Sequence, residues 1–150
     1  MSHEIGSGAW SIEVRNRAHH QVAYNLVLFT RHNDGMWLFG EAASLAQVEW
    51  RRAQLPPPEN GMLWSPGDAF DEEEASRAQG WVHTIRENIT DLLETKGDFL
   101  VDNHQEQLMA GVAGEAREMH IRAAVKELYR EGKTRCNGVG AVRRLRITQP

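Results

Sequence analysis

The sequence predicts an α+β protein that is mainly helical, in which an N-terminal β-hairpin and a helix precede a C-terminal winged helix-turn-helix. Three observations lead to this fold class. Apolar and polar residues alternate between residues 10 and 30, which is typical of strands. Apolar residues recur at helical spacing between residues 68 and 131, and a basic stretch with a glycine-rich turn closes the chain.

The length and composition fit one compact domain, or a small domain with an appendage. The chain has 150 residues, 41% of them apolar. We find no secretory signal at its start and no apolar run near the roughly 18 residues of a membrane span. The single cysteine, Cys136, excludes an intrachain disulfide and fits a reducing, cytoplasmic setting. Residues 1–9 are polar and glycine-rich, so we interpret them as a flexible lead or a tag remnant.

Two strands are expected at residues 10–17 and 21–30, joined by a hairpin-like connection. In the first strand, Trp10, Ile12 and Val14 alternate with polar residues. The second strand is apolar on both faces, which is typical of a strand in the interior of a sheet. One face carries Val22, Tyr24, Leu26 and Leu28, and the other carries Val27 and Phe29.

A helix is expected next, at residues 35–54, because apolar residues such as Met36 and Phe39 recur at helical spacing. Three consecutive prolines end this helix and make residues 56–67 a linker. The chain is therefore expected to divide into a front part and a winged helix-turn-helix domain at residues 68–150.

The front part, residues 10–55, is expected to be an assembly element. A two-stranded hairpin is marginal by itself, so its double-sided second strand needs neighbours from a second copy or from a domain outside this chain. A homo-oligomer, or a missing N-terminal domain, follows from this. The predicted interface residues are Trp10, Tyr24, Leu26, Leu28, Trp37 and Trp50.

Three helices are expected in the second half. The first is long and spans residues 65–97, with Asp71–Glu74 as a solvated acidic stretch near its start, where the helix dipole favours anions. Asp102 is expected to cap a short second helix. After the turn GVAGEA, the third helix is expected to begin near Glu115 and to end at Gly132.

The final residues are expected to form an antiparallel hairpin, with KTRC and AVRRLRI as strands and NGVG as the turn. Leu145 and Ile147 would face the helices, while Arg144 and Arg146 would point outward. Residues 132–150 carry five basic and no acidic side chains, although the net charge of the chain is −4. This order of elements is that of a winged helix-turn-helix domain, with the hairpin as its wing.

Such a domain predicts binding to double-stranded DNA. The first residues of the third helix are expected to meet base edges, while its later cations and the wing arginines meet phosphates. The predicted nucleic-acid-binding residues are Arg117, Met119, His120, Arg122, Lys126, Lys133, Arg135, Arg143, Arg144 and Arg146.

A second interpretation is a protein-interaction or dimerisation module of a larger enzyme whose catalytic domain lies outside this chain. Carboxylates flank the cations of the third helix, so these charges can also make an ordinary solvated face, and winged helices also bind proteins. We expect no enzyme, cofactor or metal site. His19 and His20 would point to opposite faces of a regular strand, and Cys136 is a lone thiol beside basic residues.

Two parts of the chain resemble the C-terminal portion of the three-Cys-motif partner (TcmP) proteins. The segment VRNRAHHQVAYNLVLFTRHNDGMWLFGEAASLAQ is similar to a strand, strand and helix of that family, and REMHIRAAVKELYREGKT with GVGAVRRLRI is similar to its winged helix. The resemblance covers about residues 10–55 and 98–148. It implies a methyltransferase-like domain with a D-P-[FY]-G motif, which is absent here, so no catalytic activity is carried over. It also implies a mobile-element setting and a three-Cys-motif protein as a partner.

Overall fold

The computed structural model of the chain describes residues 8–15, 21–57 and 66–150. It has the expected α+β class, with a small hairpin and mostly helices. The elements are β1 (Gly8–Arg15), β2 (Val22–Thr30), α1 (Asn33–Ala53), α2 (Pro66–Lys96), β3 (Phe99–Leu100), α3 (Gln105–Leu108), α4 (Glu118–Arg130) and β4 (Arg146–Ile147), with the short 3₁₀ helices η1 (Val101–Asn103) and η2 (Val142–Arg144). None of the helices in the described ranges combines the length and apolarity needed to cross a bilayer.

The N-terminal hairpin is confirmed. Strands β1 and β2 are antiparallel, and the pairs Trp10–Leu28, Ile12–Leu26 and Val14–Tyr24 place six large side chains on one face. Strand β1 begins at Gly8, so the last two residues of the expected lead belong to the sheet. His19 and His20 lie outside the described residues.

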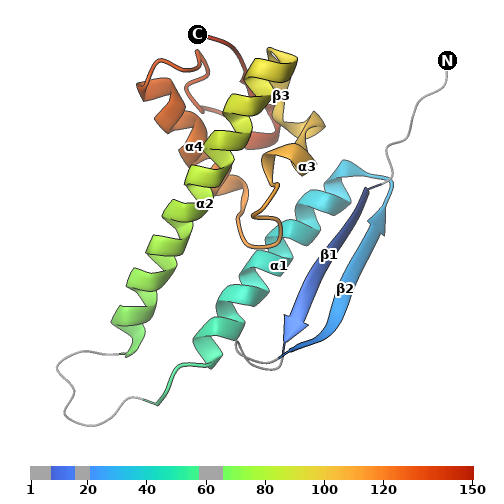
Figure 1. Cartoon of the computed structure of the whole chain (residues 1–150), viewed down its shortest axis with the longest axis vertical. Coiled ribbons are helices and arrows are strands. Elements are labelled where there is room, and N and C mark those ends of the chain that lie inside the picture. Colours follow the sequence, from blue (N-terminus) through green and yellow to red (C-terminus); the bar gives the residue numbers. More distant parts are fainter. Residues whose placement is uncertain (1–7, 16–20, 58–65) are drawn as a thin grey trace.

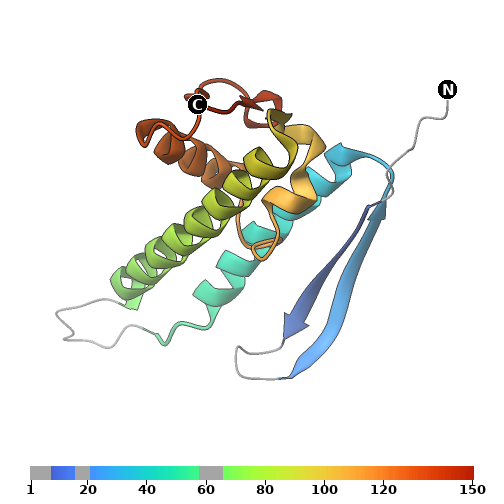
Figure 2. The ribbon, with the colours of Figure 1, turned by 45° about the horizontal axis from the view of Figure 1, so that its top comes forward.

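Helix α1 is the central layer of the molecule. In both Figure 1 and Figure 2 it lies between the hairpin on one side and α2 and α3 on the other. The ring of Trp10 contacts Phe39 of α1 at a centroid distance of 6.3 Å. Gly40 allows this approach, because a Cβ atom there would lie only 3.0 Å from the Trp10 ring.

The hydrophobic core lies in the C-terminal half. Its fully buried side chains come from α2, α3, α4 and the end of the chain. They include Ile85, Ile89, Leu108, Ile121, Leu128 and Ile147. Trp37 of α1 joins the same cluster, so α1 packs into this core rather than standing apart from it.

The expected C-terminal hairpin is wrong. Residues 133–141 form no strand, residues 142–144 form the 3₁₀ helix η2, and β4 pairs with β3 instead. Burial explains the pairing, because Phe99 and Ile147 face each other across β3 and β4 and both are buried. Gly138 and Gly140 have positive φ values of 72° and 109°, which turn the preceding loop away from extended geometry.

The turn between the short helix and α4 also differs from expectation. Helix α3 ends at Leu108, and α4 begins at Glu118 rather than near Glu115. Gly111 and Gly114 have positive φ values of 80° and 76°, which interrupt helical geometry between the two. Asp102 is not a helix cap, because the residue before α3 is His104. The winged helix-turn-helix assignment stays a prediction.

Candidate interaction surface

Exposed apolar side chains gather in the front part of the molecule. Among the described residues, nine large apolar side chains are exposed, and six of them lie in β2 and α1. They are Tyr24, Leu26, Val27, Phe29, Leu38 and Leu45. A concentration of exposed apolar side chains in one part of a soluble protein marks interaction sites more often than singly scattered ones do.

Strand β2 is exposed on both faces. Leu26 points to the α1 side and is 50% exposed, whereas Phe29 points to the opposite side and is 79% exposed. The structure therefore leaves uncovered a strand whose sequence pattern is that of a sheet interior. We call the exposed part of β2 and α1, defined by the six residues above, the β2–α1 surface.

A pocket of 560 Å³ separates the turn end of the hairpin from α1. Figure 2 shows the hairpin diverging from α1 toward that end. Apolar side chains from both elements make up most of the lining, and they include Ile12, Val14, Leu26, Phe39, Ala46 and Trp50. The hairpin and α1 thus touch firmly near Trp10 and leave apolar surface unpacked beyond it.

Five of the six predicted interface residues lie at or beside this surface. Tyr24 and Leu26 are exposed, Trp50 lines the pocket, and Trp10 and Leu28 are half-buried on the face toward α1. Trp37 does not belong to the surface. It is only 4% exposed, because its ring packs in the C-terminal core.

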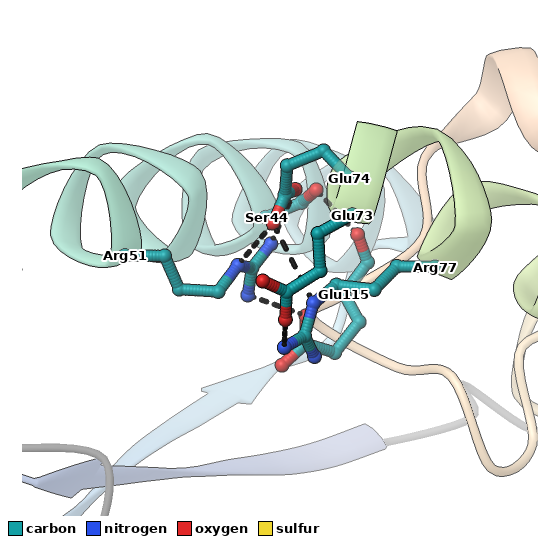
Figure 3. Close-up of polar contacts among 6 residues, drawn as sticks. All are labelled: Ser44, Arg51, Glu73, Glu74, Arg77 and Glu115. Atoms are coloured by element: carbon teal, nitrogen blue, oxygen red, sulfur yellow. Dashed lines mark hydrogen bonds and ion pairs between the residues drawn. The ribbon is translucent and has the colours of Figure 1, made fainter. Parts of the chain in front are cut away.

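A polar network fixes α1 to α2 and to the turn before α4 (Figure 3). The Nε and Nη2 atoms of Arg51 donate to the two carboxylate oxygens of Glu74 at 2.7 and 2.9 Å, and Nη1 donates to Glu115 at 3.0 Å. Burial alone would lower the pKa of Arg51, but these carboxylates outweigh it and raise the pKa. Ser44 adds a hydrogen bond from its hydroxyl to the Glu115 carbonyl oxygen.

This network corrects the interpretation of the acidic stretch Asp71–Glu74. Helix α2 begins at Pro66, so the stretch lies beyond the first turn. Glu73 accepts from Arg77 at 2.5 Å, and Glu74 is bound by Arg51. The stretch is therefore only partly solvated, and one of its members joins α1 to α2.

A second set of polar contacts, which we call the Asp102 clasp, joins the start of α1 to the C-terminal part of the chain. Asp102 Oδ1 accepts from Trp37 Nε1 at 2.7 Å and from Arg143 Nε at 3.0 Å. Arg143 also pairs with Asp34, and its guanidinium lies 5.7 Å from the Trp37 ring centroid. The hydrogen bond from Arg143 lowers the pKa of Asp34, and the same bond raises the pKa of Arg143.

These contacts weigh against the prediction that Arg143 binds phosphate. Two carboxylates of the same chain already hold its guanidinium group. A phosphate would have to displace Asp34 or Asp102, which removes most of the electrostatic gain.

A side chain of α1 covers the N-terminus of α4. The backbone N–H of Glu118 donates to the carboxylate of Glu41 of α1 at 3.0 Å, so an anion of the same chain already lies at the N-terminus of α4. Burial raises the pKa of Glu118, and Glu41 adds to this while Arg143 opposes it. The first turn of α4 therefore faces a carboxylate of α1.

His120, which the sequence predicts to contact bases, is buried in the structure. It is only 7% exposed, lies edge-on to the Trp81 ring, and accepts the backbone N–H of Arg117 at its Nδ1 atom at 2.8 Å. Burial lowers the pKa of His120, and the nearby charge of Arg117 lowers it further. Met119, by contrast, is exposed.

Several other predicted cations have partners within the molecule. Arg122 donates to the Gly140 carbonyl oxygen at 2.9 Å, Lys133 pairs with Glu131 at 2.8 Å, and Arg135 donates to the Pro150 carbonyl oxygen at 3.0 Å. The hydrogen bond from Lys133 lowers the pKa of Glu131.

Three predicted cations are more open. Lys126, Arg144 and Arg146 are exposed, and within the described ranges their side chains make no ion pair or hydrogen bond. The expected alternation near the end of the chain is confirmed, since Leu145 and Ile147 are buried between them. Glu127 of α4 and Glu131, which follows that helix directly, pair with Arg86 of α2 at 3.1 and 2.5 Å.

The described residues assemble no metal-binding group of three or more His, Cys, Asp or Glu side chains. Cys136 is a free thiol that is partly buried against the core.

Three structural features were not predicted from the sequence: the exposure of Leu38, the contact of Glu41 with α4, and the hydrogen bonds that Asp102 accepts from Trp37 and Arg143. Leu38 falls between the buried Trp37 and the half-buried Phe39 of α1, so the helical stripe could have placed it on the outer face. Glu41 and Asp102 act on residues far along the chain, and their spacing gives no signal of that.

A comparison with protein families, curated proteins and solved structures finds no match to this chain. The resemblance to three-Cys-motif partner proteins therefore stays a prediction, and the site is interpreted from its own geometry.

Proposed function

We propose that this chain is a protein-interaction module, in which a C-terminal helical core holds the hairpin and α1 as a docking element for another polypeptide. The observation that carries the proposal is the concentration of exposed apolar side chains on β2 and α1.

Two further features support docking. The pocket between the hairpin and α1 is lined mostly by apolar side chains, so filling it with partner side chains would bury surface that water now covers. The polar network around Arg51 and the Asp102 clasp both fix α1 on the core. A rigid element loses little conformational freedom when it binds, which favours affinity.

The test is native mass spectrometry of the full chain purified under mild conditions. One chain has a mass of 17.0 kDa. We expect a larger assembly whose added polypeptide is either a second copy or another protein. The substitutions Phe29→Asp and Leu38→Asp should each reduce this assembly, because a charge would be buried at the contact.

Val139→Asp is the matched control. Val139 is exposed to nearly the same degree as Leu38 but lies in the loop after α4. It should leave the assembly intact. A wild-type chain that remains alone at micromolar concentration, or an equal loss in all three variants, contradicts the proposal.

A second candidate function, contact with double-stranded DNA, is favoured by the three open cations Lys126, Arg144 and Arg146. The pairing of Glu127 and Glu131 with Arg86 takes two carboxylates out of competition with them. The contact would be to phosphates, because His120 is buried and Glu41 covers the start of α4.

Salt titration with a labelled duplex of random sequence tests this second candidate. Each phosphate contact gives a slope of about −0.9 in log affinity against log salt, so Arg144→Glu with Arg146→Glu should make the slope shallower by about 2. Arg31→Glu with Lys96→Glu changes the net charge equally at exposed residues elsewhere. No binding at low salt, or an equal effect of both pairs, excludes DNA contact through these arginines.

A further inference from the structure

We infer that the partner of β2 is a second copy of this chain, added by antiparallel pairing of the two β2 strands about a two-fold axis at Leu26. The inference rests on the proposed function and names its partner, the strand edge and the register.

The two edges of the hairpin differ in a way that selects β2. Strand β1 carries the ion pair Glu13–Arg15 at 2.6 Å and a register irregularity between Val14 and Arg15. Charges and bulges are the devices that keep an edge strand from pairing. Strand β2, VAYNLVLFT, has no charged residue in nine positions, and no other described strand pairs with its outer edge.

The sequence of β2 is complementary to itself about its centre. With Leu26 opposite Leu26 of the second copy, Phe29 lies opposite Ala23, and Tyr24 lies opposite Leu28. A large residue thus meets a small one on the outer face, and an aromatic residue meets an aliphatic one on the α1 side. The remaining pairs are Val22 with Thr30 and Asn25 with Val27, so no position of this register places like charges together.

The resulting sheet adds to the support that α1 already gives the hairpin near Trp10. Pairing would satisfy the outer backbone edge of β2 and cover apolar side chains that α1 leaves exposed. A two-fold axis perpendicular to the sheet joins the two hairpins into one antiparallel sheet of four strands. The two residues of each cross-strand pair then lie on the same face of that sheet. Leu26 and Tyr24, which are exposed in one chain, then face neighbours on the added strand.

Disulfide trapping tests the register. In the full chain with Cys136→Ala, Leu26→Cys places the two new thiols directly opposite each other, at a Cα separation of about 4.5–5.5 Å that a disulfide spans. Asn25→Cys is the control, because its two copies would lie diagonally, about 7–8 Å apart, beyond disulfide reach. Mild oxidation should convert Leu26→Cys to a covalent dimer several-fold more completely than Asn25→Cys.

Equal trapping of the two variants, or trapping of neither, overturns the inference. Sedimentation velocity of the unmodified chain gives a second readout that needs no folded variant, and it should show a dimer at micromolar concentration. If native mass spectrometry instead finds one copy bound to a different polypeptide, the second-copy inference fails while the docking function stands. If the chain is a lone monomer, both fail.

Discussion

The C-terminal core and the β2–α1 surface treat their apolar residues in opposite ways. In the core, side chains such as Ile85 and Leu128 are fully buried by contacts from several elements. In β2 and α1, Phe29 and Leu38 are 79% and 73% exposed. The same kind of side chain stabilises the fold in one region and is exposed to solvent in the other, and this difference is the basis of the proposal that a partner covers the hairpin and α1.

The largest expected effect is the difference in stability between a core substitution and a surface substitution. Leu128→Ala removes a fully buried side chain and should lower the free energy of unfolding by about 2–5 kcal/mol. Leu38→Ala, on the exposed side of α1, should change it by no more than about 0.5 kcal/mol in the isolated chain. Urea unfolding of the two variants checks this, and similar losses would mean that Leu38 is buried in solution.

A smaller effect is expected at the clasp between the two regions. Asp102→Ala leaves the Nε1–H of Trp37 and the Nε–H of Arg143 without their acceptor, while Arg143 keeps its pair with Asp34, so the free energy of unfolding should fall by about 1–3 kcal/mol. Asp91→Ala is the control, because Asp91 is exposed and its carboxylate makes no contact with another described side chain. Thermal unfolding should shift for the first variant and hardly at all for the second.

The smallest effect concerns pH. Because burial lowers the pKa of His120, the unfolded chain binds a proton there more readily than the folded chain. The lowered pKa therefore has no effect on the free energy of unfolding above the ordinary histidine value of about 6.5, and that free energy decreases as the pH falls below it. His120→Asn keeps an acceptor for the Arg117 N–H and cannot titrate. Its unfolding free energy should therefore fall less over this range, and parallel pH profiles would exclude the buried, neutral histidine.

The sequence was sufficient for the elements that repeat a pattern. Alternation predicted β1 and β2 to within two residues, and helical spacing predicted α1 and α2. It was insufficient for β3 and β4, which pair two residues each across a separation of more than forty positions. Segments this short show no alternation of apolar and polar residues. The sequence therefore predicts pairing of the last strand with the segment just before it, and not with β3.

At the candidate sites, too, local patterns could be predicted from the sequence and contacts between distant residues could not. The apolar character of both faces of β2 follows from its pattern, as Leu26 and Phe29 point to opposite sides, but the pattern is that of a buried strand and does not predict their exposure. The role of Arg143 does not, because its partner Asp34 lies 109 positions away in the sequence. Charge counting predicted a basic end but could not tell which of its arginines were already paired.

Hydrogen exchange of the β2 backbone at several protein concentrations tests the central claim most directly. If a second β2 strand completes the sheet, the amides of β2 should be protected at high concentration and exchange faster on dilution, while the amides of α2 and α4 stay equally protected throughout. Exchange of the β2 amides that is independent of concentration would contradict completion of the hairpin by a second copy.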